Sequence, residues 1–177
     1  VMKSFQDEYK FGSSADLGIS AAYQFNDNFM MDAIIVNGEG YKKVQVEDGL
    51  AYGLGMTAQM LDGLTLRLYG GMNEATPGLD DSYNLAAFAG YKDNDFSIGV
   101  EYNAYWNSGY TKDANQSGFS VYSSQKLNDK VSIYARADQL TSKDDWNKAN
   151  DGMFSLVGVE IKLNKYIQLS PNLRVWT

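Results

Sequence analysis

The chain has 177 residues, 44% of them hydrophobic, and a formal net charge of −7. It has no cysteine, which excludes a disulfide framework, and no histidine, which removes the commonest acid–base side chain and the commonest metal ligand. No stretch approaches the roughly 18–20 uncharged apolar residues of a membrane-spanning helix, and the acidic balance provides no basic stripe for nucleic acid.

Ten strands are predicted from the alternation of apolar and polar residues. In chain order they span 15–25, 29–37, 50–60, 64–73, 82–91, 96–106, 117–127, 131–138, 153–163 and 166–176. The alternation is clearest in 64–73, where leucines alternate with Thr65, Arg67 and Tyr69. It is ambiguous in 29–37, whose apolar residues fall on both faces. With 17 glycines, 13 tyrosines and only 2 prolines, the composition also favours long unbroken strands.

Short polar turns alternate with longer polar connections between these strands. The turns are at 26–28, 61–63, 92–94, 128–129 and 164–165. The longer connections are 38–49, 74–81, 107–116 and 141–151. Short turns on one side of a sheet and long loops on the other are typical of antiparallel outer-membrane barrels.

Aromatic residues gather near both ends of the predicted strands. Beside the short turns lie Phe25, Phe29, Tyr91, Phe96 and Tyr166. Nearer the long loops lie Tyr52, Tyr83, Trp106 and Phe119. Two such bands are typical of the aromatic girdles at membrane interfaces, so we expect an all-β, antiparallel transmembrane β-barrel in the bacterial outer membrane, in contact with its lipid. The alternative is a soluble β protein with ordinary strand aromatics over an apolar core.

Strand direction predicts where the chain sits in such a barrel. If the short turns face the periplasm, the chain starts and stops on the extracellular side. Complete bacterial barrels have an even strand number and normally keep both termini in the periplasm. We therefore expect residues 1–177 to be part of one barrel domain that is incomplete at both ends. The alternative is a complete ten-stranded barrel whose lumen is filled by side chains.

Three short motifs lie in the first 40 residues. They are Lys3-Ser4-Phe5, the stretch 12–18 that ends in Asp16-Leu17-Gly18, and Asn37-Gly38-Glu39-Gly40. They resemble the phosphate-selective porin (O and P) superfamily, in a branch common in Bacteroidetes, where an Arg/Lys-Ser-Phe loop leads into a strand opening with Asp-Leu-Gly. The next strand in that family ends near Asn-Gly-Glu-Gly. The resemblance implies an outer-membrane porin of about sixteen strands, of which ten are present here, and self-association into trimers.

Charged and tyrosine residues on the polar strand faces are the candidate functional residues. An arginine facing lipid near the membrane midplane would cost about 2–4 kcal/mol, so these side chains are expected to face the lumen. The candidate pore-lining residues are Asp32, Arg67, Tyr69, Glu101, Tyr105, Tyr134, Arg136, Asp138, Glu160, Lys162 and Arg174. The charged residues either line the pore or pair to brace its wall, and the tyrosines either stack a sugar or fill space. Acids and bases in this set nearly cancel, so phosphate selectivity is not carried over from the family.

No catalytic chemistry is predicted. Without histidine, no residue pattern suits proton transfer near neutral pH, so the chain is not expected to be an enzyme or to need a cofactor. The pairs Asp80-Asp81 and Asp144-Asp145 lack the ligand spacing of a calcium site and are predicted to be solvated loop charges. Strand glycines such as Gly53 and Gly55 are expected to relieve crowding.

The predicted function is passive diffusion of small hydrophilic solutes or ions through a porin-like channel. Barrel width and lumen charge would set its selectivity. The alternative is a non-conducting barrel that serves as an anchor or scaffold in a surface or secretion complex. In that case loops 107–116 and 141–151, with Tyr110 and Trp146, would contact other outer-membrane proteins.

Overall fold

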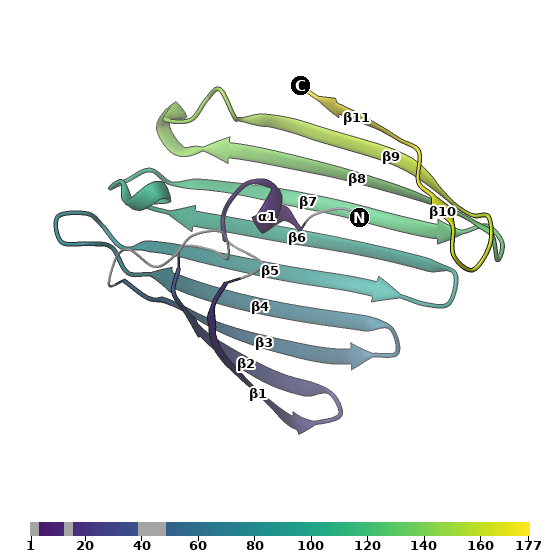
Figure 1. Cartoon of the computed structure of the whole chain (residues 1–177), viewed down its shortest axis with the longest axis horizontal. Coiled ribbons are helices and arrows are strands. Elements are labelled where there is room, and N and C mark those ends of the chain that lie inside the picture. Colours follow the sequence, from purple (N-terminus) through teal and green to yellow (C-terminus); the bar gives the residue numbers. More distant parts are fainter. Residues whose placement is uncertain (1–3, 13–15, 39–48) are drawn as a thin grey trace.

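The described part of the chain folds as one curved antiparallel sheet (Figure 1). The computed structural model describes residues 4–12, 16–38 and 49–177. Parts of the predicted motifs (Lys3, 13–15 and 39–40) and most of the connection 38–49 lie outside these residues. The predicted all-β, antiparallel fold class is confirmed.

Each strand pairs with its neighbour in the sequence, except that the last one, β11, pairs with β9. The strands are β1 (Gly18–Asn26), β2 (Phe29–Val36), β3 (Ala51–Leu61), β4 (Leu64–Asn73), β5 (Ser82–Lys92), β6 (Phe96–Trp106), β7 (Gln116–Lys126), β8 (Val131–Ser142), β9 (Gly152–Lys162), β10 (Gln168–Leu169) and β11 (Asn172–Trp176). The helices are α1 (Phe5–Glu8) and two 3₁₀ turns in the long loops, η1 (Ser108–Tyr110) and η2 (Lys143–Asp145). The short turns lie at one end of the sheet and the long loops at the other (Figure 1).

The predicted single strand 166–176 is wrong, because it is divided into β10 and β11. Leu169 lies opposite Ile161 and Asn172 lies opposite Gly158, so both parts keep the same register on β9. The break falls at Pro171. Its carbonyl accepts a hydrogen bond of 3.0 Å from the Val159 backbone N–H, but its nitrogen has no hydrogen to return the bond.

Side-chain caps explain why the short turns could be located from the sequence. In the turn after β5, Asp93 Oδ1 accepts the backbone N–H groups of Asp95 and Phe96 at 2.9 and 2.7 Å. Asn26, Asn128 and Asn164 accept backbone N–H groups in the same way. The turn between β3 and β4 instead uses Gly63, whose φ of +84° favours glycine. Each short turn is therefore stabilised locally.

The two faces of the sheet differ in polarity and in exposure to solvent. The concave face holds the buried polar residues, among them Asn103 and Asp138, which are 0% and 1% exposed. The convex face exposes large apolar residues, such as Leu54 at 51% and Phe119 at 60%. A water-soluble sheet normally shows the opposite arrangement, with the apolar face covered.

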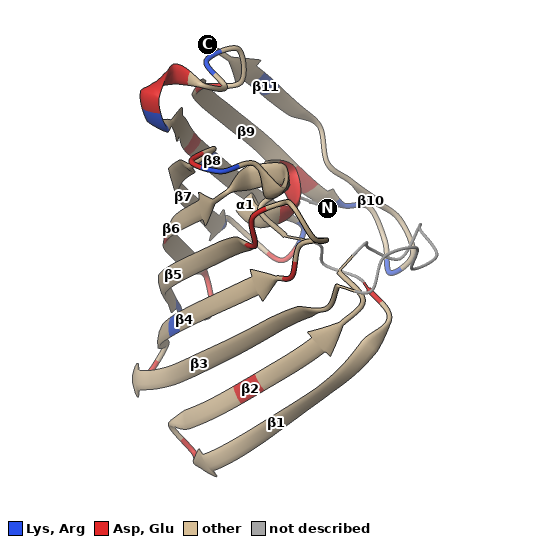
Figure 2. Cartoon of the chain, turned by 90° about the vertical axis from the view of Figure 1, so that its left-hand side faces the viewer, with Lys and Arg blue, Asp and Glu red and all other residues tan. Residues whose placement is uncertain are grey.

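The helix α1 lies over the concave face of the sheet (Figure 2), and a small apolar core joins its segment, the N-terminal segment of residues 4–12, to that face. Phe5 and Phe11 are 1% and 0% exposed and pack with Leu140. A helix as short as α1 is not stable alone, so this contact with the sheet holds it in place. Gly118 lies directly beneath, where an added Cβ would overlap the Phe5 ring.

No helix in the described ranges is long and apolar enough to span a membrane.

Candidate functional site

The register places all eleven candidate residues on the concave face. Asp32 lies opposite Gly55, which lies opposite Tyr69, and directly opposed residues project to the same side of a sheet. Alternation along each strand extends this assignment to the whole set. The residues that share the face are Asp32, Arg67, Tyr69, Glu101, Tyr105, Tyr134, Arg136, Asp138, Glu160, Lys162 and Arg174.

Arg67 and Asp32 form a bidentate ion pair across three strands. Arg67 Nη1 donates to Asp32 Oδ2 at 2.6 Å and Nη2 donates to Oδ1 at 2.9 Å. Nη1 also donates to Thr57 Oγ1 at 2.8 Å. The pair passes over Gly55 on the intervening strand, where a Cβ would overlap both charged groups. These charges therefore neutralise each other and brace strands β2, β3 and β4 of the sheet.

We expect Gly55→Ala to lower the free energy of unfolding by about 1–2 kcal/mol, because its methyl group separates Arg67 from Asp32. Gly70→Ala is the matched control, since an added Cβ there meets nothing within 4 Å. Urea unfolding in lipid vesicles, followed by tryptophan fluorescence, would compare the two variants. Equal stability of the two would show that the ion pair does not depend on the space above Gly55.

A second ion pair is buried beneath the N-terminal segment. Arg136 Nε donates to both Asp138 oxygens at 2.8 and 3.0 Å, and the two side chains are 7% and 0% exposed. Asp138 also accepts from Ser120 Oγ at 2.6 Å and from the Tyr9 hydroxyl at 2.8 Å. This network joins β7, β8 and the N-terminal segment through one carboxylate.

Burial and the hydrogen bond to Asp138 raise the pKa of the Tyr9 phenol well above its ordinary value. The phenol is therefore protonated at neutral pH and donates to the carboxylate. Because its pKa is higher in the folded state, the stabilisation is complete below the ordinary tyrosine pKa of about 10 and declines at more alkaline pH.

The remaining candidates fall into four environments. Glu101 Oε1 accepts from Asn103 at 2.8 Å, and Arg174 Nε donates to Asn172 at 3.0 Å. Tyr134 shares a 2.8 Å hydrogen bond with Ser170, which braces β8 against the chain between β10 and β11. Tyr69 and Tyr105 border open pockets. Glu160 and Lys162 lie near the short turns, opposite Ser132 and Gln168.

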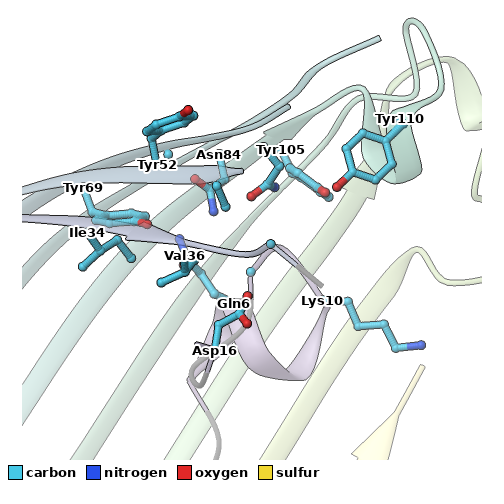
Figure 3. Close-up of a pocket in the computed structure, with 15 residues that line it drawn as sticks. Gln6, Lys10, Asp16, Ile34, Val36, Tyr52, Tyr69, Asn84, Tyr105 and Tyr110 are labelled. Carbon is cyan, nitrogen blue, oxygen red and sulfur yellow. The ribbon is translucent and has the colours of Figure 1, made fainter. Parts of the chain in front are cut away.

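Two pockets lie between the N-terminal segment and strands β2 to β7. The loop-side pocket, of about 310 Å³, is bordered by Lys10, Asn84, Tyr105 and Tyr110 (Figure 3). The mid-sheet pocket, of about 500 Å³, is bordered by Arg67, Phe88, Glu101 and Tyr122. Both pockets are also lined by Gln6, Ile34 and Tyr69. The two pockets are therefore adjacent, with these three side chains between them.

The long loops at the same end of the sheet pack against each other. Trp146 Nε1 and the Lys143 backbone N–H both donate to the Asn115 carbonyl, at 2.6 and 2.9 Å. Trp146 is still 42% exposed, and Tyr110 borders the loop-side pocket. Of the two residues predicted as docking contacts, only Tyr110 is thus next to the concave face.

Sequence reasoning missed the N-terminal segment as part of the site. Phe5, Tyr9 and Phe11 lie outside every predicted strand, and this group of aromatics in an otherwise polar stretch was the available signal. Phe5 and Phe11 are buried against the concave face, and Tyr9 packs against them. Other residues of the same segment, Ser4, Gln6, Lys10 and Gly12, line the two pockets.

A scan against models of protein families and a search of curated proteins found no match to this chain. Among the residues that the structure describes, no three acidic, histidine or cysteine side chains are grouped to hold a metal ion. The geometry of the concave face therefore carries the functional argument.

Proposed function

We propose that the chain forms part of the wall of a porin-like β-barrel in the bacterial outer membrane, through which small hydrophilic solutes or ions diffuse passively. The observation that carries this proposal is the distribution of side chains between the two faces of the sheet. Its concave face holds the charges and buried polar groups, and its convex face exposes large apolar residues. A barrel between lipid and a water-filled lumen requires this distribution.

Strand length and aromatic placement support the same conclusion. Strands β1 to β9 are 8–12 residues long, close to the roughly 9–11 residues of a tilted transmembrane strand. On the convex face Tyr83 lies opposite Trp106 near the long loops, and Tyr91 lies near the short turns. Aromatic residues at both levels suit two membrane interfaces.

Closure of the barrel is part of the proposal. In the described sheet one edge is β1 and the other is β10 with β11, and the two edges do not pair with each other. Open edges are unfavourable in lipid because their N–H and C=O groups have no partners there. The proposal therefore includes further strands that complete the wall. The resemblance to the phosphate-selective porin superfamily supports a porin function in general. It is not taken to imply selectivity for phosphate.

Single-channel recording of the protein in planar bilayers tests the proposal. Stepwise, ohmic conductance is expected. A complete lack of conductance would favour the second candidate function, a barrel that anchors a surface complex. The observation in favour of that candidate is the N-terminal segment, which occupies the concave face and is fixed there by Phe5, Phe11 and Tyr9.

Ion selectivity is expected to follow the Arg67–Asp32 pair. Asp32→Asn leaves a cation on the wall and should favour anions, whereas Arg67→Gln should favour cations. A unit charge about 7 Å from a permeating ion changes its energy in water by about 0.6 kcal/mol, which is about threefold for each ion. The changes for anion and cation have opposite signs, so the anion/cation permeability ratio should shift about sevenfold. Reversal potentials in a KCl gradient measure this.

Asp129→Asn is the control, because this carboxylate is 95% exposed in a short turn outside the concave face. It should leave the reversal potential unchanged. Shifts of the same sign in Asp32→Asn and Arg67→Gln would contradict an electrostatic origin.

A further inference from the structure

We infer that the two pockets form one binding track for neutral saccharides, an inference that rests on the proposed channel function and specifies its solute. The track begins at the loop-side pocket, passes Tyr69 and continues into the mid-sheet pocket. Gln6, Ile34 and Tyr69 line both pockets, so the two pockets are adjacent and share one aromatic side chain.

The track runs parallel to the strands. The loop-side pocket reaches Asn73 at the end of β4, beside the long loops. The mid-sheet pocket reaches Arg67 in the middle of β4 and Tyr122 in the middle of β7. A solute moving along it would therefore travel across the proposed membrane and not around the wall.

Aromatic side chains border the track along its length. Tyr110 and Tyr105 border the loop-side pocket, Tyr69 borders both pockets, and Phe88 and Tyr122 border the mid-sheet pocket. The rings of Phe88 and Tyr122 are stacked, with an interplanar angle of 11° and centroids 6.4 Å apart. The electron-rich face of an aromatic ring attracts the C–H groups on the apolar face of a pyranose. A series of such rings suits a sugar that is passed from one site to the next.

Polar groups suited to sugar hydroxyls lie beside these rings. Gln6 and Asn84 carry amides, and the tyrosines carry hydroxyls that both donate and accept hydrogen bonds. Volumes of about 310 and 500 Å³ lie within the usual range for small-molecule sites. Apolar faces with a few polar groups at their edges are the chemistry of a pyranose site.

The charges along the track favour a neutral solute. Lys10 and Asp16, of opposite sign, border the loop-side pocket. In the mid-sheet pocket Arg67 and Asp32 neutralise each other at 2.6 Å, which leaves Glu101 as the remaining charge. At the lining residues that the structure describes, a phosphate or other anion would meet this carboxylate without a surplus cation. These residues do not form the basic lining that an anion-selective site needs.

The test is block of the ion current by maltotriose, a neutral linear trisaccharide. Maltotriose added to the long-loop side of the protein in planar bilayers should reduce the current in a saturable manner. Tyr69→Ala should weaken the apparent affinity about tenfold, whereas Tyr69→Phe should keep most of it because the ring remains. Tyr91→Ala is the matched control, since Tyr91 lies on the convex face, is exposed and borders neither pocket.

The outcomes separate this inference from the function on which it rests. Conductance without maltotriose block, or block that is equal in Tyr69→Ala and the unmodified protein, would overturn the saccharide track and leave the channel intact. Block by inorganic phosphate or choline in place of maltotriose would overturn the solute class. Absence of conductance would overturn the channel function. Calorimetric titration of maltotriose into the detergent-solubilised protein would then test independently whether the saccharide binds.

Discussion

Asp138→Asn is expected to lower the free energy of unfolding by about 3–5 kcal/mol, which is the usual cost of removing one partner of a buried ion pair. Asp138 is fully buried and accepts hydrogen bonds from Arg136, Ser120 and Tyr9. The substitution leaves the guanidinium of Arg136, itself 7% exposed, without the carboxylate that balances it. Urea unfolding in lipid vesicles would measure the loss.

Two further variants test whether the loss of stability in Asp138→Asn comes from the buried network. Asp129→Asn removes the partner of Lys126 in a short turn, where the carboxylate is 95% exposed, and should cost at most about 1 kcal/mol. Tyr9→Phe removes only the hydroxyl that contacts Asp138 and should loosen the N-terminal segment without unfolding the sheet. If Asp138→Asn were no more destabilising than Asp129→Asn, the network beneath the segment would not be a stabilising element.

Local chemistry explains how much of the sheet could be predicted. Asp93 and Asn128 cap their own turns, so these turns depend on neighbouring residues alone. The alternation of side chains then assigns each strand residue to a face, and the register places the candidate residues on the same face. Pro171 was also a local signal, but the alternation of 166–176 continues through it, and the break in the strand was missed.

Side-chain contacts between strands could not be predicted from the sequence, because they depend on the register in which the strands pair. The sequence allowed Arg67 either to line the lumen or to brace the wall. Its pairing with Asp32, 35 residues away, depends on the glycine that separates them on β3. The ambiguous strand 29–37 has a similar explanation. Ile34 and Val36 point to the concave face but border the loop-side pocket, so polar character is not required of them there.

The N-terminal segment could not be predicted because it is held by tertiary contacts. Four helical residues are too few for a periodic pattern. Phe5 and Phe11 are buried against residues more than 70 positions away, such as Leu140. The sequence therefore did not indicate that residues 4–12 cover part of the concave face.

The double variant Phe5→Ala, Phe11→Ala is expected to release the N-terminal segment from the concave face and to increase single-channel conductance. Each phenylalanine is almost completely buried, and truncation of such a side chain costs about 3–5 kcal/mol. The two losses together exceed the roughly 5.5 kcal/mol that changes a two-state population from 99:1 to 1:99. The sheet should survive, because its strands are held by their own hydrogen bonds.

Leu68→Ala is the control, since Leu68 is 44% exposed on the convex face and contacts neither pocket. It should leave conductance unchanged. Hydrogen exchange of residues 4–12 would report release independently of current. Release without a rise in conductance would mean that the segment does not limit the solute path, and that the narrow point by Gln6 and Tyr69 is set by the sheet. A rise in conductance with release would identify the segment as the element that narrows the channel.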